Sequence, residues 1–179
     1  MANWIIDTSH SQITFTVRHM VFAKVRGEFK KWTAELALGD DLTTSQVKVE
    51  IDASSIDTAE EKRDGHLRSA DFFDVESHPK LSFVSKRVEK TGSGLRLVGD
   101  LTIRGTTQEI ALEVEETGRG KDPWGQDRVG FAGKTTIDRT QFGLKWNAAL
   151  EAGGVLVSEK VDIGIEVQAV HKVEQATAA

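Results

Sequence analysis

The chain has 179 residues, 39% of them hydrophobic, which is enough for one domain with a full core. A net charge of -5 argues against nucleic acid as a partner, and the lack of cysteine excludes disulfides, a thiolate nucleophile and a cysteine-bound metal. Neither a membrane-spanning apolar stretch nor a signal peptide is visible, so we expect a cytoplasmic protein, or a periplasmic one if a signal has been removed.

The first part of the chain alternates between apolar and polar residues, which predicts β-strands with one buried face. Ile13, Phe15 and Val17 alternate with polar neighbours in the first clear strand. We expect a second, long strand from Lys24 to Leu38, in which a change of apolar phase near Trp32 indicates a bulge. The third strand has its apolar residues at Val47, Val49 and Ile51.

The stretch from Thr58 to Phe83 is the one long interruption of the strand pattern. Thr58 and Glu61 have the spacing of a capping box, which predicts a helix that begins near Ala59 and crosses over a sheet as a lid. The apolar stripe of this helix would consist of Leu67, Ala70 and Phe73.

After the helix the alternation resumes, in strands that follow one another as a meander. Its apolar residues lie in segments 81–90, 95–103, 110–114, 129–137 and 155–167. Residues 117–127 are rich in Gly, Asp and Pro, and we expect them to form the longest hairpin loop. A short helical turn is predicted within 138–144. Residues 1–172 would form a single domain, followed by a flexible C-terminal tail at 173–179.

About eight long antiparallel strands make this an all-β fold with one crossover helix. Strands of a doubly wound parallel sheet would instead read as continuous apolar runs. Eight strands can close into a barrel that is filled by side chains or holds one small ligand. A two-sheet sandwich is the alternative, but strands of ten or more residues at ~3.3 Å each are longer than a sandwich usually needs.

Motifs for catalysis, metal binding or a cofactor are not found. The five histidines show no HExxH and no short paired spacing, and there is no GxSxG elbow and no Walker loop. Asp122 and Asp127 flank Trp124 without the spacing of a calcium loop. We therefore predict no catalytic residue, no metal site and no cofactor.

Several polar residues occupy unusual positions at the ends of strands and in the helix. They can be structural, with hydrogen bonds that close the barrel and anchor the helix. The alternative is that they form a site for a ligand headgroup at the mouth of the barrel. These residues are Asp7, His10, Ser11, Arg18, His19, Arg63, Asp64, Asp100, Arg104 and Arg139.

Six segments, in order along nearly the whole chain, resemble the YceI-like family of bacterial polyisoprenoid-binding proteins. They are DTSHSQITFTVRHM at 7–20, GEF at 27–29, IDTAEEKRDGHLRSADFFDVESHPKLSF at 56–83, GDLTIRGTTQEI at 99–110, RTQFGL at 139–144 and EKVDIGIE at 159–166. The resemblance implies an extended, lipocalin-like eight-stranded antiparallel barrel whose hydrophobic tunnel holds a long isoprenoid or similar amphiphile. It supplies no catalytic motif.

On this resemblance we expect a non-enzymatic protein that sequesters or transports a long-chain isoprenoid lipid, such as a polyprenyl phosphate or an isoprenoid quinone. The expected tunnel lining is Ile13, Phe15, Val17, Val49, Phe72, Phe73, Leu81, Phe83, Leu101, Phe131 and Phe142. Arg18, His19 and Arg63 are candidates for contact with a polar headgroup. Gly27, Gly99 and Gly133 would leave room in the tunnel or serve as points of close packing.

Two alternatives stay open. One is an enzyme that acts on a lipid in the barrel, with His19 or His66 as acid or base. The other is a filled barrel that acts only as an interaction module, for example as a homodimer.

Overall fold

The computed structural model describes residues 1–151 and 154–171, so the tail predicted at 173–179 lies outside the described residues. The strands are β1 (Ala2–Ile6), β2 (Gln12–His19), β3 (Ala23–Phe29), β4 (Trp32–Leu38), β5 (Gln46–Asp52), β6 (Ile56–Asp57), β7 (Lys80–Lys90), β8 (Leu95–Ile103), β9 (Thr106–Lys121), β10 (Asp127–Asp138) and β11 (Lys160–His171). The α-helix is α1 (Glu61–Arg68), and the 3-10 turns are η1 (Thr8–His10), η2 (Leu42–Thr44), η3 (Ala53–Ser55) and η4 (Arg139–Phe142).

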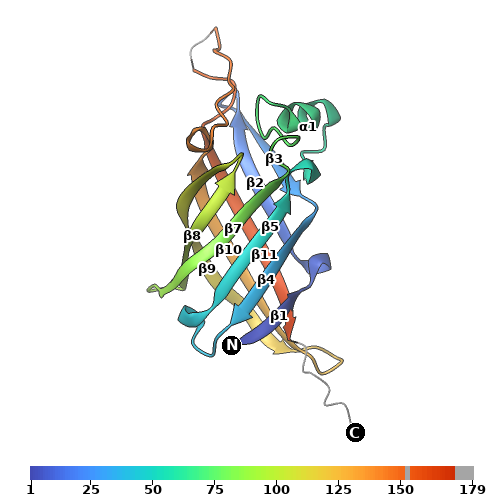
Figure 1. Cartoon of the computed structure of the whole chain (residues 1–179), viewed down its shortest axis with the longest axis vertical. Coiled ribbons are helices and arrows are strands. Elements are labelled where there is room, and N and C mark those ends of the chain that lie inside the picture. The colour runs from blue at the N-terminus through green and yellow to red at the C-terminus, as the bar shows by residue number, and fades with distance from the viewer. Residues whose placement is uncertain (152–153, 172–179) are drawn as a thin grey trace.

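The strands close into an antiparallel barrel. Hydrogen bonding runs in the order β1-β4-β5-β7-β8-β9-β10-β11, and β11 returns to β1 through the pairs Ile5↔Val170 and Ile6↔Ala169. Closure leaves no free sheet edge in this ring of eight. The all-β, eight-stranded barrel predicted from the alternation is therefore confirmed, and Figure 1 shows its elongated shape.

In three places the barrel wall contains two short strands that follow each other end to end, separated by a break in the ladder. We call each such pair a line of the wall. β1 continues into β2, β4 continues β3, and β6 follows β5, because β2 pairs with β3 and β3 with β6, just as β1 pairs with β4 and β4 with β5. The breaks at η1 and η3 begin where Asp7 and Asp52 each accept a hydrogen bond from the backbone N–H two residues later, at 3.1 Å.

The long strand predicted from Lys24 to Leu38 is therefore wrong in its middle, because it is divided between β3 and β4. The neighbouring turn η3 supplies the reason. Ser55 accepts from the Lys30 amide with its carbonyl at 3.2 Å and from the Lys31 amide with its hydroxyl at 3.1 Å, in place of a continuous ladder. The break between β3 and β4 thus coincides with a contact to η3, in place of the bulge predicted within one strand.

The helix α1 lies across one end of the barrel (Figure 1) and begins later than predicted. Glu60 is its N-cap, and its carboxylate accepts from the Arg63 amide at 2.6 Å. Thr58 is not the cap, because Ala59 has φ +63° and turns the chain between Thr58 and the helix. The Thr58 amide instead donates to the buried carboxylate of Asp64 at 2.9 Å. The predicted capping box is therefore wrong.

The apolar stripe predicted for the helix is incorrect as a single helical face, although Leu67 and Phe73 do pack against the core. The helix ends at Arg68, so Ala70 and Phe73 lie beyond it, and Ala70 is exposed. The residue that is buried after the helix is Phe72, at 5% exposure.

The ends of the last strands differ from their predicted limits as well. β9 extends to Lys121 and pairs with β10 from Asp127, so the long hairpin loop expected at 117–127 shrinks to residues 122–126. Asp122 holds this short turn by accepting from the amides of Trp124 and Gln126, at 3.0 and 2.9 Å. The helical turn predicted within 138–144 is confirmed as η4.

The alternation predicts that Val155 and Val157 belong to the last strand, and this is wrong. In the structure β11 begins at Lys160, and Val155 and Val157 form only isolated bridges with Ala149 and His19. The segment before β11 projects from the same end of the molecule as α1 (Figure 1).

Candidate functional site: an apolar cavity along the barrel

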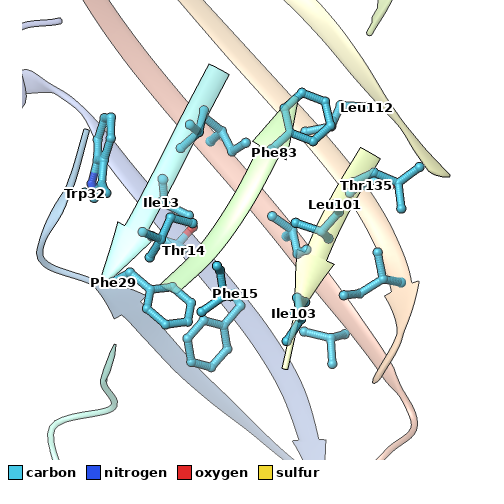
Figure 2. Close-up of a pocket in the computed structure, with 18 of the residues that line it drawn as sticks. Ile13, Thr14, Phe15, Phe29, Trp32, Phe83, Leu101, Ile103, Leu112 and Thr135 are labelled. Carbon is cyan, nitrogen blue, oxygen red and sulfur yellow. The ribbon is translucent and has the colours of Figure 1, made fainter. Parts of the chain in front are cut away.

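A cavity of about 550 Å³ lies inside the barrel, within the ~300–1,000 Å³ that small-molecule sites usually have. Successive strand residues point to opposite faces, so the inward set of each strand faces this space. Figure 2 shows side chains of four strands converging on it: Ile13 and Phe15 of β2, Phe29 of β3, Phe83 of β7 and Leu101 of β8.

All eleven residues expected to line a tunnel are found on the wall of this cavity: Ile13, Phe15, Val17, Val49, Phe72, Phe73, Leu81, Phe83, Leu101, Phe131 and Phe142. Their contact with a ligand stays a prediction. The expected lining omitted the inward residues of β11, whose alternation is as regular as that of β2. These are Val161, Ile163, Ile165 and Val167.

The three glycines singled out in the sequence, Gly27, Gly99 and Gly133, differ in their roles. A Cβ on Gly27 would lie 2.3 Å from Cζ of Phe15, and one on Gly99 would lie 2.5 Å from Cζ of Phe83. These two glycines are points of close packing that admit aromatic rings. Gly133 differs, because a Cβ there would meet Val114 at an ordinary 3.5 Å while facing the cavity.

Polar lining residues gather at the α1 end of the cavity. His19, Thr58, Lys62, Arg63, His66 and Arg139 all belong to its wall. Lys62 and Arg63 also face solvent, so the cavity opens beside α1, and we call this opening the mouth. At the other end Trp4, Leu36 and Leu38 form a separate buried cluster with Val129 and Ala169.

Arg63 is a guanidinium held in place at the mouth. Its Nε donates to the Thr58 hydroxyl at 2.7 Å, and its Nη2 donates to the Thr58 carbonyl at 2.8 Å. Within residues 1–151 and 154–171, Nη1 has no hydrogen-bond acceptor. An arginine has five N–H donors, so donors remain for a phosphate or a carbonyl at the mouth.

The other two headgroup candidates lie on different sides of the wall. His19 lines the cavity, whereas Arg18, its neighbour on the same strand, points outward and is not part of the lining. The structure therefore brings His19 and Arg63 to the mouth but not Arg18.

An aromatic group surrounds His66 at the mouth. The His66 ring lies edge-on to Trp146 at 4.7 Å and to Phe72 at 5.1 Å between ring centroids. Its Nε2 lies 2.8 Å from Oδ2 of Asp71. His66 thus has a carboxylate partner and a fixed ring plane beside the cavity.

Arg139 is buried at the mouth and donates four hydrogen bonds to backbone carbonyls. It donates to Leu144 at 2.6 Å, Ser158 at 2.9 Å, Trp146 at 3.0 Å and Val157 at 3.3 Å. Burial lowers the pKa of its guanidinium below the ordinary value. Arg139 therefore ties residues 144–146 and 157–158 to the rim of the barrel.

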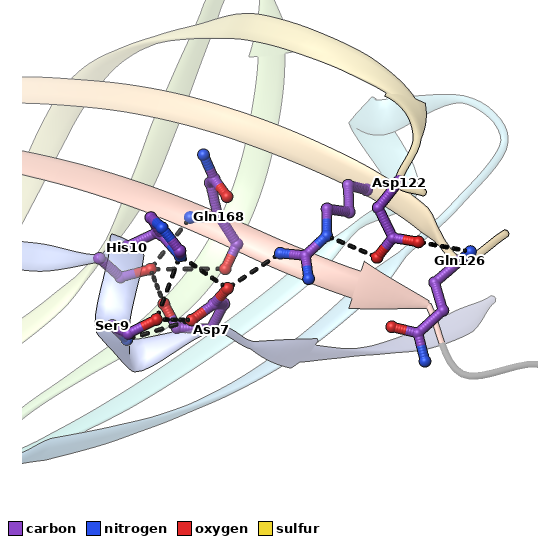
Figure 3. A network of polar contacts seen from close by, with 8 residues as sticks. Asp7, Ser9, His10, Asp122, Gln126 and Gln168 are labelled. Atoms are coloured by element: carbon purple, nitrogen blue, oxygen red, sulfur yellow. Dashed lines mark hydrogen bonds and ion pairs between the residues drawn. The ribbon is translucent and has the colours of Figure 1, made fainter. Parts of the chain in front are cut away.

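A second polar network lies away from the mouth and joins η1 to β10 (Figure 3). Asp7 Oδ2 accepts from Arg128 Nη1 at 2.9 Å and lies 2.9 Å from His10 Nδ1, while Arg128 Nε donates to Asp122 at 2.9 Å. Hydrogen bonds from Ser9, Arg128 and His10 hold the pKa of Asp7 well below its usual range. This network is a structural tie and not part of the cavity.

Two negative findings apply to the described residues. No set of three His, Cys, Asp or Glu side chains among them is placed to hold a metal ion. None of their helices has the length and apolar character needed to cross a membrane.

Comparison with known proteins places this geometry in a family. The model of the YceI-like domain matches residues 4–169. A UPF0312 protein of Staphylococcus epidermidis is 42% identical over 164 residues, which cover 90% of this chain and 93% of that protein. The YCEI protein of Campylobacter jejuni has a similar structure, with a TM-score of 0.76 at 28% identity, covering 87% of this chain and 90% of that one.

A polyisoprenoid binding domain from Saccharophagus degradans shares the fold, with a TM-score of 0.68 at 15% identity over 96% of this chain and 99% of that one. The family model and the Staphylococcus relative each span most of the sequence, in agreement with the closed barrel and its cavity. The chain belongs to the YceI-like family.

Proposed function

We propose that the barrel binds a long-chain isoprenoid lipid without chemical turnover, and so sequesters or transports it. The observation that carries this proposal is the cavity of about 550 Å³, whose wall is apolar along the barrel and polar mainly at the mouth. That distribution suits an amphiphile with a long apolar tail and one polar end. The polyisoprenoid binding domain from Saccharophagus degradans, which has the same fold, supports the choice of ligand class.

The energetics favour a carrier for such a tail. Burial of one CH₂ contributes about 0.8 kcal/mol, so a five-carbon isoprene unit contributes on the order of 3 to 4 kcal/mol. Part of this gain is offset by the ordering of a flexible chain. The wall of the cavity carries aromatic and branched aliphatic side chains, whose low polarity suits an apolar, branched tail.

Arg63 and His19 would contact the headgroup. A polyprenyl phosphate would accept charge-assisted hydrogen bonds from the donors of Arg63 that Thr58 does not use, and Lys62 would add a second positive charge. An isoprenoid quinone needs only neutral donors. The headgroup is thus the part of the ligand that variants at the mouth can distinguish.

Organic extraction of the purified protein followed by mass spectrometry tests the proposal. Buffer and an unrelated protein are extracted in parallel. We expect a prenyl lipid in stoichiometric amount. A blank that persists after a polyprenyl phosphate and an isoprenoid quinone have been offered would contradict the proposal and favour the interaction module, for which sedimentation velocity would reveal a homodimer.

A further inference from the structure

The turn between β2 and β3 exposes three consecutive apolar side chains at the mouth end of the barrel. Phe22 is 89% exposed and Val21 is 61% exposed. Met20 and Val155, each 43% exposed, lie at the same end of the barrel. We call these four residues the apolar tip. Single exposed apolar residues are ordinary on a protein surface, but a group of them at one projecting end calls for a reason.

The backbone of this turn makes the group more unusual. Met20 has φ +53° and Val21 has φ +67°, in the left-handed region that glycine and asparagine adopt most readily. A β-branched residue such as valine is disfavoured there. The chain thus keeps an exposed apolar side chain at a position where a small or polar residue would fit the backbone better.

Basic residues flank the apolar tip. Residues 18–26 include Arg18, Lys24 and Arg26 and no acidic residue, in a chain whose net charge is -5. Arg18 and Lys24 are direct partners across the two strands, an arrangement that like charges normally disfavour. Among the ion pairs of residues 1–151 and 154–171, none includes any of these three residues.

The basic excess is local to this turn. The segment at 143–160 balances Lys145 and Lys160 against Glu151 and Glu159. The chain around α1, at 60–76, has six acidic residues, Glu60, Glu61, Asp64, Asp71, Asp74 and Glu76, against three lysines and arginines, Lys62, Arg63 and Arg68. An anionic surface would therefore be attracted to the β2–β3 turn and not to the helix side of the mouth.

The apolar tip is continuous with the mouth of the cavity. The Met20 amide donates to the Leu156 carbonyl at 2.8 Å, and His19 is bridged to Val157. His19, Val25, Leu156 and Val157 all belong to the cavity wall. A surface that contacts the tip would thus lie beside the opening through which a lipid enters.

We propose that the apolar tip docks the mouth of the barrel onto an anionic lipid bilayer. The apolar side chains enter the boundary between headgroups and acyl chains, and Arg18, Lys24 and Arg26 contact anionic headgroups. Four projecting side chains are few against the ~800 Å² per partner that a stable protein interface needs, which favours a bilayer over a protein. The purpose of this docking, delivery and collection of lipid, rests on the proposed function, but the contact itself does not.

Vesicle flotation tests the docking directly. Vesicles of phosphatidylcholine alone and of equal parts phosphatidylcholine and phosphatidylglycerol, both free of isoprenoid, are mixed with the protein. We expect binding to the anionic vesicles, reduced roughly tenfold or more in the V21S/F22S variant and roughly fivefold, in a salt-dependent way, in K24Q. Trp124→Ser is the matched control, because Trp124 is 79% exposed in the hairpin at the opposite end of the barrel and its loss should not change binding.

A label at the tip gives a second readout. Since the chain has no cysteine, Phe22→Cys and Trp124→Cys each provide one site for an environment-sensitive fluorophore. Anionic vesicles should shift the emission of the label at position 22 to shorter wavelength and leave the label at 124 unchanged. Both variants change exposed positions, and circular dichroism melts verify that they fold.

Three outcomes would overturn the proposal: no binding of the wild type to anionic vesicles, equal binding of wild type and V21S/F22S, or dimers in sedimentation velocity that V21S/F22S abolishes while vesicles stay unbound. The last would assign the tip to a second copy of the chain. Uptake of a prenyl lipid in vesicle-free solution is measured separately. Uptake without vesicle binding contradicts the docking alone, and vesicle binding without uptake contradicts the proposed function alone.

Discussion

The ring of Phe15 lies directly against the backbone of Gly27 on the neighbouring strand, where an added Cβ would be 2.3 Å from Cζ. The glycine is therefore the reason that this ring fits between β2 and β3 on the cavity side of the wall. Phe83 lies against Gly99 in the same way. Two of the aromatic rings that line the cavity therefore fit only because the residue they lie against is a glycine.

Gly27→Ala should lower the free energy of unfolding by about 1–3 kcal/mol, because the ring of Phe15 must move off its site. Denaturant unfolding measures the loss. Gly118→Ala is the control, since nothing lies within 4 Å of its Cβ position. Addition of Phe15→Leu should recover part of the loss, and no recovery would show that the strain lies elsewhere.

Arg63→Ala should weaken binding of a polyprenyl phosphate by roughly ten- to hundredfold, since a charge-assisted hydrogen bond is worth about 1.5–3 kcal/mol, and should leave quinone affinity almost unchanged. Equilibrium titration with both ligands measures this selectivity. Arg96→Ala removes an arginine that pairs with Glu113 outside the cavity lining and should affect neither ligand. Equal affinities of wild type and Arg63→Ala for the phosphate would exclude Arg63 from the headgroup site.

Arg139→Met should destabilise the protein by about 2–4 kcal/mol, because four carbonyls that accept from this guanidinium lose their donor. The loss should be accompanied by faster amide hydrogen exchange at residues 144–147 and 155–158, because the guanidinium ties Leu144, Trp146, Val157 and Ser158 to the rim. If exchange at these residues stayed unchanged, Arg139 would not be their anchor.

The acid stability of the protein should depend on Asp7. Its pKa is lowered in the folded state, mainly by the hydrogen bond from Ser9 and then by Arg128 and His10. A depressed carboxyl pKa stabilises the fold above the unfolded value of ~3.9, and this contribution is lost as pH falls from there through the folded pKa. Asp7→Asn should therefore be less stable than wild type at pH 7 and show a smaller loss of stability below ~3.9. Parallel unfolding curves over that range would contradict the assignment.

Val21→Gly should raise the free energy of unfolding by about 1 kcal/mol, because glycine adopts the φ of +67° without strain. The same change should weaken binding to anionic vesicles. Val84→Gly is the control, since Val84 is exposed in the regular strand β7 and its replacement should destabilise. A less stable Val21→Gly variant would show that the valine contributes to folding.

The sequence predicts the inward faces of the strands well, because a period of two residues is a local property that each strand shows by itself. For this reason the alternation assigns residues as far apart in the sequence as Ile13 on β2 and Phe131 on β10 to one wall. The mouth is harder to predict, because its order depends on contacts between distant segments. Arg139 is an example, since the carbonyls that surround it follow it by 5 to 19 residues.

The breaks in the wall and the start of α1 could not be read from the sequence for a related reason. Thr58 and Glu61 have the correct spacing for a capping box, but the buried carboxylate of Asp64 competes for the Thr58 amide. Likewise Lys30 and Lys31 lie outside the strands, where their amides donate to Ser55. In both places a tertiary contact outweighs a local preference.

Native mass spectrometry can measure whether the cavity holds one isoprenoid lipid. Wild type, Gly133→Leu and Gly92→Leu are each incubated with a polyprenyl phosphate and an isoprenoid quinone, and circular dichroism establishes that all three fold. Gly133 faces the cavity, whereas nothing lies within 4 Å of the Cβ position of Gly92 and it lies outside the lining. We predict one lipid per chain in wild type and Gly92→Leu and clearly lower occupancy in Gly133→Leu. Equal occupancy in all three, or no bound lipid in wild type, would show that the cavity is not the lipid site.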